Sequence, residues 1–209
     1  VRNDAANEGG AIHTGGNATS VDLYNVTITD NNAGANGGGI NRDGGTFGVY
    51  NSIISDNTAS SNPECNGTYS GETAQNNLFG VNNVSGGCAF GTSVNNTTPM
   101  GDTDTIFVVG GDGDALLTDN GGATQTVLLA PGSTAIGAGD AAQLPADTLD
   151  ADDDDDTAET IEVDQIGGVR VQSGILDAGA VEFGCAVSGY AYPYTLGTVS
   201  NNLPADLRT

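Results

Sequence analysis

The stretch Val49–Asn57, VYNSIISDN, repeats the stretch Leu23–Asn31, LYNVTITDN, which lies 26 residues earlier. Tyr, Asn, Ile, Asp and Asn recur at the same five places in both stretches. A repeat of about 20 to 50 residues indicates stacked copies of one supersecondary unit. The chain is therefore expected to be a solenoid, at least over its first third.

The repeat extends beyond these two stretches. Val1, Ile28 and Ile54 align at spacings of 27 and 26 residues, and Ile12 aligns with Ile40. Short β-branched runs alternate with polar residues and end at Asn and Gly, which is typical of short strands separated by tight corners. We therefore predict an all-β fold, a three-sided right-handed parallel β-helix with irregular C-terminal turns. The alternative is a β-sandwich in which two strands are similar by chance.

The repeat weakens after Asn62, and this divides the chain into three parts. Residues 1–62 are expected to form regular turns, residues 63–184 irregular turns with an acidic insert, and residues 185–209 an extended tail rich in Tyr. Cys65 and Cys88 flank a Gly-rich loop and are expected to form a disulfide worth about 3 kcal/mol. Two buried thiols are the alternative, and Cys185 has no assigned partner.

The charge of the chain excludes some classes of partner. It has 27 acidic and 4 basic residues, a formal net charge of −23. Such a surface repels phosphate, so no nucleic acid is expected to bind, and anionic membranes are disfavoured. No apolar run of about 18 residues is present, so no membrane insertion is expected.

Two acidic clusters are candidate calcium sites, because calcium prefers several hard oxygen ligands. The spacing of the larger cluster does not fit an EF-hand, since Asp155 and Ile161 stand at its sixth and twelfth places. A solvated acidic loop is the alternative. The larger cluster comprises Asp150, Asp152, Asp154, Asp156, Glu159 and Asp164, and the smaller comprises Asp102, Asp104, Asp112 and Asp114.

Catalytic signals are weak. The single histidine, His13, lies beside a predicted corner, and a lone histidine is poor evidence for acid–base catalysis. With four Arg and no Lys, a uronate-cleaving lyase is disfavoured, and a hydrolase would need two or three carboxylates in one cleft. No enzymatic activity, and no organic cofactor, is therefore expected. Glycosylation sequons begin at Asn17, Asn25, Asn66, Asn83, Asn95 and Asn96.

Three C-terminal motifs resemble a known family. These are DNGGATQTVLLAPGSTAIGAGD (Asp119–Asp140), DQIGGVR (Asp164–Arg170) and DAGAVEF (Asp177–Phe183), the last of which includes a predicted strand. They resemble bacterial parallel β-helix surface proteins with a choice-of-anchor Q domain, which are similar in style to polymorphic outer-membrane proteins. The resemblance implies an exported structural or adhesive protein, extracellular or on a bacterial cell surface, and transfers no catalytic residue.

The ends of the solenoid suggest self-assembly. Val1 aligns with later turns without a preceding cap, and Tyr190, Tyr192 and Tyr194 alternate in the tail. Open solenoid ends can pair with further strands, so head-to-tail stacking of copies into a calcium-stabilised fibre is expected. The alternatives are a carbohydrate-binding adhesin and a polysaccharide lyase or hydrolase. An outward-facing pair of Tyr24 and Tyr50 would favour the adhesin, and a cleft lined by three carboxylates would favour the enzyme.

Overall fold

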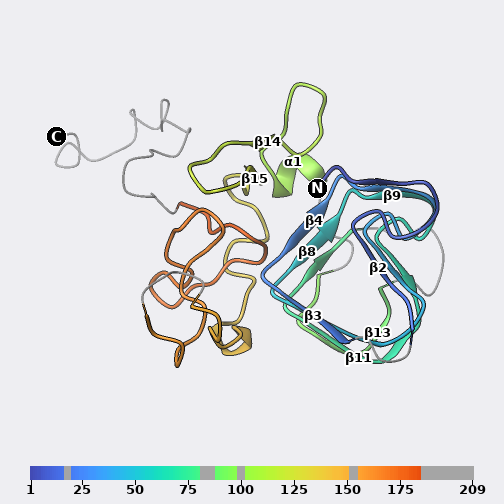
Figure 1. The fold of residues 1–209 in the computed structure, drawn as a ribbon. Coiled ribbons are helices and arrows are strands. Elements are labelled where there is room, and N and C mark those ends of the chain that lie inside the picture. The colour runs from blue at the N-terminus through green and yellow to red at the C-terminus, as the bar shows by residue number, and fades with distance from the viewer. Residues whose placement is uncertain (17–19, 81–87, 98–101, 151–154, 185–209) are drawn as a thin grey trace.

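The chain forms a coil of parallel strands with a second, less regular region packed along one side (Figure 1). The structure is a computed structural model and describes residues 1–16, 20–80, 88–97, 102–150 and 155–184. The coil spans residues 1–97, and the C-terminal region spans residues 102–184. The all-β, solenoid-like arrangement that the repeat predicts is confirmed, and the sandwich alternative is excluded because the stacked strands run parallel.

The first three turns of the coil each contribute one strand to each of four parallel sheets, where the sequence predicted three sides. The first sheet contains β1 (Asp4–Ala5), β5 (Asn32–Asn36) and β9 (Thr58–Ser61). The second contains β2 (Ile12–Thr14), β6 (Ile40–Arg42) and β10 (Cys65–Gly67). The third contains β3 (Ser20–Tyr24), β7 (Thr46–Tyr50), β11 (Tyr69–Gln75) and β13 (Phe90–Val94). The fourth contains β4 (Thr27–Thr29), β8 (Ile53–Ser55) and β12 (Leu78–Phe79).

The observed register confirms most of the predicted repeat. Ile28 pairs with Ile54, and Ile12 pairs with Ile40. The alignment of Val1 with Ile28 is wrong by one residue. Asp4 pairs with Asn32, so the offset here is 28 residues and brings Val1 beside Thr29. Val1 packs against the hydrophobic cluster between the coil and the C-terminal region.

The interior and the corners of the coil explain why this sequence forms short strands. Ile28, Val49 and Ile54 point inward and pack with Phe47 and Tyr69. The corner between the third and fourth sheets is an Asn on every turn, and each adopts a left-handed backbone that Asn tolerates. These corner residues are Asn25 (φ 50°), Asn51 (φ 50°), Asn76 (φ 59°) and Asn95 (φ 53°).

Buried Asn side chains stack along the coil and carry hydrogen bonds from one turn to the next. The Asn77 carboxamide accepts from the backbone N–H of Ser52 at 2.8 Å and donates to the Val49 carbonyl at 2.9 Å. Asn31 donates to the Asn57 side chain at 2.8 Å in a second column. These ladders satisfy polar groups where the strands end and the backbone turns.

The predicted disulfide between Cys65 and Cys88 is confirmed. It joins β10 to the segment before β13 across 23 residues of chain, and the Cys65 side chain is fully buried. The bridge thereby holds the shortened last turn against the coil interior, where Tyr69 and Phe90 also pack.

The C-terminal region covers the outer face of the fourth sheet. Ile53 and Leu78 point away from the coil interior and pack against Ile106, Phe107 and Leu129. The elements of this region are few and short: α1 (Thr103–Ile106), an antiparallel hairpin of β14 (Leu117–Thr118) and β15 (Thr126–Val127), and the 3-10 helix η1 (Ala141–Gln143). A hydrophobic seam thus fixes this region to the coil.

The strand predicted within DAGAVEF does not form. The backbone N–H of Glu182 donates to the Asp164 carboxylate at 2.9 Å, and that of Phe183 donates to the Asp177 carboxylate at 2.6 Å. Carboxylates thus take the place that a neighbouring strand would fill. The tail of residues 185–209, including Tyr190, Tyr192 and Tyr194, lies outside the described residues.

Candidate functional site

Tyr24 and Tyr50 form a ring pair on the outer face of the third sheet. Leu23 and Val49 point into the coil, so the alternation along β3 and β7 turns the two tyrosines outward. Their ring centroids are 4.8 Å apart and the planes differ by 11°. Gly48 makes room for this arrangement, because a Cβ there would lie 2.8 Å from Cε2 of Tyr50. The pair therefore faces outward and not into the core of the coil.

Asn25 follows Tyr24 in the chain, and the hydrogen bonding of its side chain differs from that of the Asn side chains at the same corner in later turns. The Asn51 carboxamide donates to the carbonyl of Asp140 at 3.1 Å and accepts from its backbone N–H at 2.9 Å. Asn76 donates to the carbonyl of Ala138 at 3.4 Å. Asn25 is 7% exposed, yet neither its Nδ2 nor its Oδ1 has a hydrogen-bond partner among the described residues.

Two adjoining cavities open beside this unpartnered amide, and we call them together the seam cavity. The larger, about 460 Å³, lies between Asn25–Thr27 of the coil and a wall formed by Val163, Gln165 and Ala180. The smaller, about 50 Å³, is lined by Tyr24, Leu144 and Pro145. Asn25, Ile161 and Arg170 line both. The seam cavity therefore connects the tyrosine pair with the C-terminal region.

Arg170 supplies a second unpartnered group to the seam cavity. Its side chain is 5% exposed, and Nη1 donates to the carbonyl of Gly179 at 3.0 Å and to the Glu182 carboxylate at 3.2 Å. Its Nε, in contrast, has no partner among the described residues. Asn25 and Arg170, which both line the seam cavity, thus have two donor atoms and one acceptor atom without partners in the described part of the chain.

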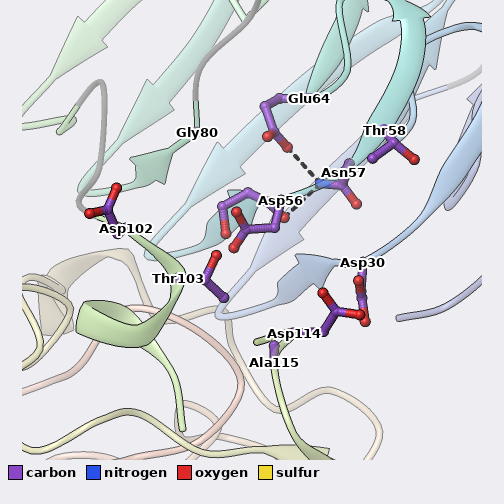
Figure 2. A pocket seen from close by; sticks show the side chains of 11 residues that line it. Asp30, Asp56, Asn57, Thr58, Glu64, Gly80, Asp102, Thr103, Asp114 and Ala115 are labelled. Carbon is purple, nitrogen blue, oxygen red and sulfur yellow. Dashed lines mark hydrogen bonds between the residues drawn. The ribbon is translucent and has the colours of Figure 1, made fainter. Parts of the chain in front are cut away.

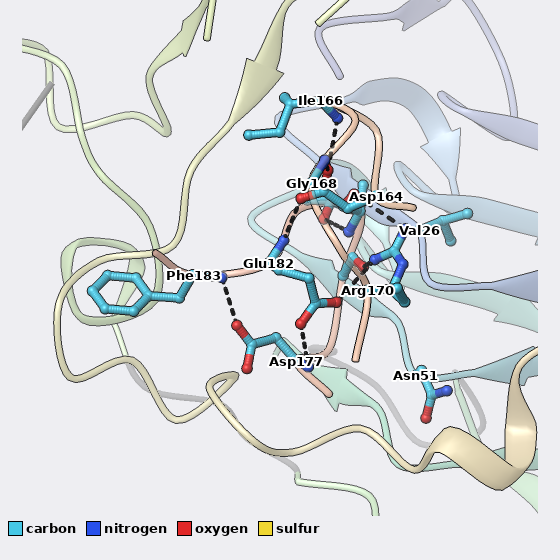
Figure 3. Close-up of polar contacts among 12 residues, drawn as sticks. Val26, Asn51, Asp164, Ile166, Gly168, Arg170, Asp177, Glu182 and Phe183 are labelled. Carbon is cyan, nitrogen blue, oxygen red and sulfur yellow. Dashed lines mark hydrogen bonds and ion pairs between the residues drawn. The ribbon is translucent and has the colours of Figure 1, made fainter. Parts of the chain in front are cut away.

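A network of carboxylates holds Arg170 in place (Figure 3). Glu182 also accepts from the backbone N–H of Asp177 at 2.8 Å. Asp164 accepts from the backbone N–H groups of Ile166 at 3.0 Å and Gly168 at 2.7 Å. Burial raises the pKa of Glu182 to about 7, although the bonds from Asp177 and Arg170 oppose this shift.

A second cavity, of about 530 Å³, lies at the C-terminal ends of the strands of the fourth sheet, whereas the seam cavity lies at their N-terminal ends. We call it the acidic cavity (Figure 2). The coil contributes carboxylates at the corner after the fourth sheet and in the turn before β10. The C-terminal region contributes two more, from the start of α1 and from the loop before Ala115. The five carboxylates are those of Asp30, Asp56, Glu64, Asp102 and Asp114.

Two of these carboxylates are shifted toward their neutral forms. Burial raises the pKa of Glu64 to about 7, although the Asn57 amide donates to it at 2.6 Å. Desolvation raises the pKa of Asp56, and the charges of Asp30, Asp114 and Asp102 add to that increase. The acidic cavity therefore holds more negative charge than its surroundings balance.

A third polar cluster lies on the outer face of the second sheet. Within the described ranges, one group of three His, Cys, Asp or Glu side chains has its possible metal-ligand atoms within 4.8 Å of one another. It consists of Glu8, His13 and Asp43. His13 Nε2 lies 2.9 Å from the Asp43 carboxylate, and the Asn41 amide donates to Asp43 at 3.0 Å. Hydrogen bonds already account for the proximity of these groups, and His13 is exposed beside a corner, as the sequence predicted.

The acidic clusters predicted from sequence are only partly brought together. Asp102 and Asp114 both line the acidic cavity, whereas Asp112 accepts the backbone N–H of Asp114 within its own loop. Asp104 is exposed on α1. Of the larger cluster, Asp152 and Asp154 lie outside the described residues.

The described members of the larger cluster have local roles. Asp150 accepts from the backbone N–H of Asp155 at 3.2 Å, and Asp156 accepts from that of Ala158 at 2.9 Å. Glu159 is half-buried. Asp164 is buried, and its carboxylate is used by three backbone N–H groups, those of Ile166, Gly168 and Glu182.

The glycosylation candidates fall in different environments. Asn25 is buried at the seam cavity, and Asn66 is half-buried with its side chain bonded to Asn41 and Asn62. Asn95 is exposed at the last corner and Asn96 is half-buried. Asn17 and Asn83 lie outside the described residues.

The sequence did not indicate the seam cavity. In the sequence, Asn25 is recognisable only as the first residue of a sequon, and Arg170 only as the last residue of the DQIGGVR motif. Their meeting depends on how the C-terminal region lies along the coil. The one signal in the sequence is the column of corner asparagines, because a polar side chain there must find a partner on whatever covers the corner.

No helix in the described part of the chain is long and apolar enough to cross a membrane. Comparison of the chain with protein-family models, with curated proteins and with solved structures found no match. The functional assignment therefore depends on the residues of the seam cavity and of the acidic cavity themselves.

Proposed function

We propose that this protein binds a neutral oligosaccharide in the seam cavity, as an adhesin-like protein built on a right-handed parallel β-helix. The observation that carries the proposal is the Asn25 amide, which is buried beside the outward pair of Tyr24 and Tyr50 and has no hydrogen-bond partner among the residues that the structure describes. A buried amide without partners costs free energy unless a ligand or water satisfies it.

Asn51, at the same corner one turn later, indicates which groups such an amide can bind. Asn51 engages the N–H and the C=O of Asp140 with its two side-chain functions. Neighbouring hydroxyls of a sugar offer the same combination, because each hydroxyl can both donate and accept. Nε of Arg170 adds a further donor on the opposite wall.

The tyrosine pair favours a sugar over a peptide strand. Tyr24 lines the smaller part of the seam cavity, so a ligand bound to Asn25 would lie close to its ring. Aromatic rings offer large apolar faces against which the C–H groups of a pyranose can pack. A peptide strand would have no comparable use for two stacked rings on an outer face.

The charge of the protein limits the class of sugar. With a formal net charge of −23, the protein would repel polyuronates and sulfated glycans. Arg170 offers little compensation, because its charge already interacts with Glu182. The favoured ligand is therefore uncharged.

The proposed location is outside the cell, on a bacterial surface. Two observations support it: the C-terminal motifs resemble those of choice-of-anchor Q surface proteins, and the disulfide between Cys65 and Cys88 is of a kind that persists in oxidising compartments.

The test compares the purified protein with Asn25→Gly on an array of neutral and acidic glycans, followed by calorimetry on the best neutral ligand. Glycine accepts the φ of 50° at this corner, so the variant removes the amide without straining the backbone. Asn95→Gly is the matched control, since Asn95 has a φ of 53° at an exposed corner. We expect Asn25→Gly to weaken binding about tenfold or more and the control to leave it unchanged.

A Tyr24→Ala variant separates the two parts of the site, and we expect a loss of similar size. Equal affinities for the wild type and both variants would contradict the proposal. So would an array on which only anionic glycans bind, or none at all.

Self-assembly is a second candidate function. The observation in its favour is that β1–β4 each pair on one side only among the described strands. A second copy could continue these parallel ladders head to tail. Sedimentation over a wide concentration range tests this, and a protein that stays monomeric in the presence of calcium would exclude it.

A further inference from the structure

The acidic cavity is lined by a buried hydroxyl that has no hydrogen-bond partner in the described part of the chain. This hydroxyl is Oγ of Ser55, a residue that is 1% exposed. Ile53 packs against the C-terminal region and Ile54 packs inside the coil, so the alternation along β8 turns Ser55 to the outer face of the sheet. Because a buried hydroxyl costs free energy until a ligand or water satisfies it, Ser55 indicates an occupant for the cavity.

Carboxylates that are more exposed than Ser55 line the same cavity (Figure 2). Asp56, Asp102 and Asp114 are exposed and Asp30 is half-buried, and we call these four the rim carboxylates. Their charges act on one another, since those of the other three add to the increase that desolvation causes in the pKa of Asp56. The cavity thus combines a buried hydroxyl with several repelling negative charges nearer to solvent.

The side chain of Arg2 shows how an organic cation binds at this place. Its Nε donates to the Asp30 carboxylate at 2.9 Å, and its Nη2 donates to the carbonyl of Ala115 at 3.2 Å. One cation thereby contacts both the coil and the C-terminal region. Among the described residues, no recorded ion pair reaches the other three rim carboxylates.

The spacing of these carboxylates does not suit a single metal ion. Within the described ranges, no three carboxylates of the cavity bring their oxygens within 4.8 Å of one another. Glu64 adds no ligand to this account, because its carboxylate already accepts from Asn57 at 2.6 Å. Negative charges that repel one another but cannot share one ion favour a ligand that carries several positive charges at separate points.

We propose that the acidic cavity binds an aliphatic polyamine, with a terminal ammonium group donating to Ser55 Oγ and the other ammonium groups against the rim carboxylates. Each terminal ammonium group has three N–H donors, so it can reach a hydroxyl and a carboxylate together. The cavity volume of about 530 Å³ is within the usual range for small-molecule sites. A single lysine side chain of a partner protein would supply only one positive charge, and would leave most rim carboxylates unbalanced.

The inference goes beyond the proposed carbohydrate site and does not rest on it, because that site lies at the N-terminal ends of the same strands. Asn25→Gly, which tests the carbohydrate site, should therefore bind a polyamine as the wild type does. A bound polyamine would join the acidic walls of the coil and the C-terminal region, so it is expected to raise the melting temperature of the protein.

The experiment measures the binding of spermidine to the full chain by calorimetry at a fixed ionic strength. Ser55→Ala is the principal variant, because it removes the hydroxyl without changing the net charge. Asp56→Asn is the second variant, since Asn tolerates the left-handed backbone at this corner, where φ is 56°. Asp22→Asn is the matched control and removes one charge from an exposed position on the third sheet. Thermal unfolding without ligand checks that all three variants fold.

We expect one spermidine to bind per chain and Asp22→Asn to bind it as the wild type does. Ser55→Ala should weaken binding about tenfold, because a hydrogen bond from a charged donor is lost. Asp56→Asn should weaken it about threefold, as expected for an exposed ion pair. The rise in melting temperature with spermidine should decrease in the same order.

Three further results would overturn the proposal, as would the absence of saturable binding to the wild type. Equal losses in Asp56→Asn and Asp22→Asn, with none in Ser55→Ala, would show attraction by net charge alone. Stoichiometric displacement of spermidine by calcium at the same ionic strength would assign the cavity to a metal ion. Tighter binding of trilysine than of spermidine would assign it to a basic protein partner.

Discussion

The coil is rich in Asn and the C-terminal region is rich in Asp, and the two are stabilised in different ways. In the coil, strand pairs with a constant offset stack turn on turn, and Asn side chains bond from each turn to the next. In the C-terminal region strands are short, and carboxylates bind backbone N–H groups in their place. A regular backbone distributes its stability over many equivalent bonds, whereas the C-terminal region concentrates it in a few buried charges.

The largest effect is expected from breaking the buried ion pair of the C-terminal region. Glu182→Ala leaves Arg170 charged and buried without its partner, so we expect a loss of about 3–5 kcal/mol in the free energy of unfolding at pH 8. Urea denaturation measures the loss. The exposed pair of His13 and Asp43 on the coil is the control, and Asp43→Ala should cost less than about 1 kcal/mol. Similar losses in both variants would remove the contrast between the two regions.

The disulfide between Cys65 and Cys88 tests what stabilises the last turn of the coil. Replacing Cys65 and Cys88 by Ser frees a loop of 23 residues, and we expect a loss of about 3 kcal/mol by the chain-entropy estimate. The urea midpoint should fall while the dependence of stability on Glu182 remains. An unchanged midpoint would mean that strand pairing alone holds the last turn of the coil.

The Asn columns should show a smaller and graded effect. Asn77→Ala removes bonds to Ser52 and Val49 inside the coil, and we expect a loss of about 2 kcal/mol. Asn96→Ala, one turn further and half-buried, should cost clearly less. Thermal unfolding of the two variants measures the difference, and a reversed order would show that the columns do not follow burial.

The same contrast explains which parts of the fold the sequence predicts. In the coil the repeat of side chains is also a repeat in space, so Ile28 and Ile54, and Tyr24 and Tyr50, pair as the alignment implies. Val1 departs because six positions separate Thr14 from Ser20 but only four separate Arg42 from Thr46, which adds two residues to the first turn. Such a change in a corner alters the offset without altering the strands.

The candidate sites are less predictable, because each lies where the two regions meet. The acidic cavity combines Asp30 and Asp56 of the coil with Asp102 and Asp114, whereas in the sequence only neighbouring acidic residues form a group. Asn25 resembles Asn51 in sequence, but within the described ranges the C-terminal region provides hydrogen-bond partners for Asn51 and none for Asn25. Periodicity carries no information about that contact.

The smallest expected effect concerns pH and again separates the two regions. Because burial raises the pKa of Glu182 to about 7 from a usual value near 4.5, the folded protein retains a proton there that the unfolded chain has already released. The free energy of unfolding should therefore fall as the pH rises from about 4.5 to about 7. Glu182→Gln cannot ionise, so the stability of the wild type relative to this variant should decrease across that window. Both proteins are measured by urea denaturation at pH 5 and pH 8, and because both contain Glu64, its titration in the acidic cavity cancels in the comparison. A wild type that gains stability relative to Glu182→Gln as the pH rises would mean that Arg170 outweighs burial, and that the C-terminal region is held by its ion pair at acidic as well as neutral pH.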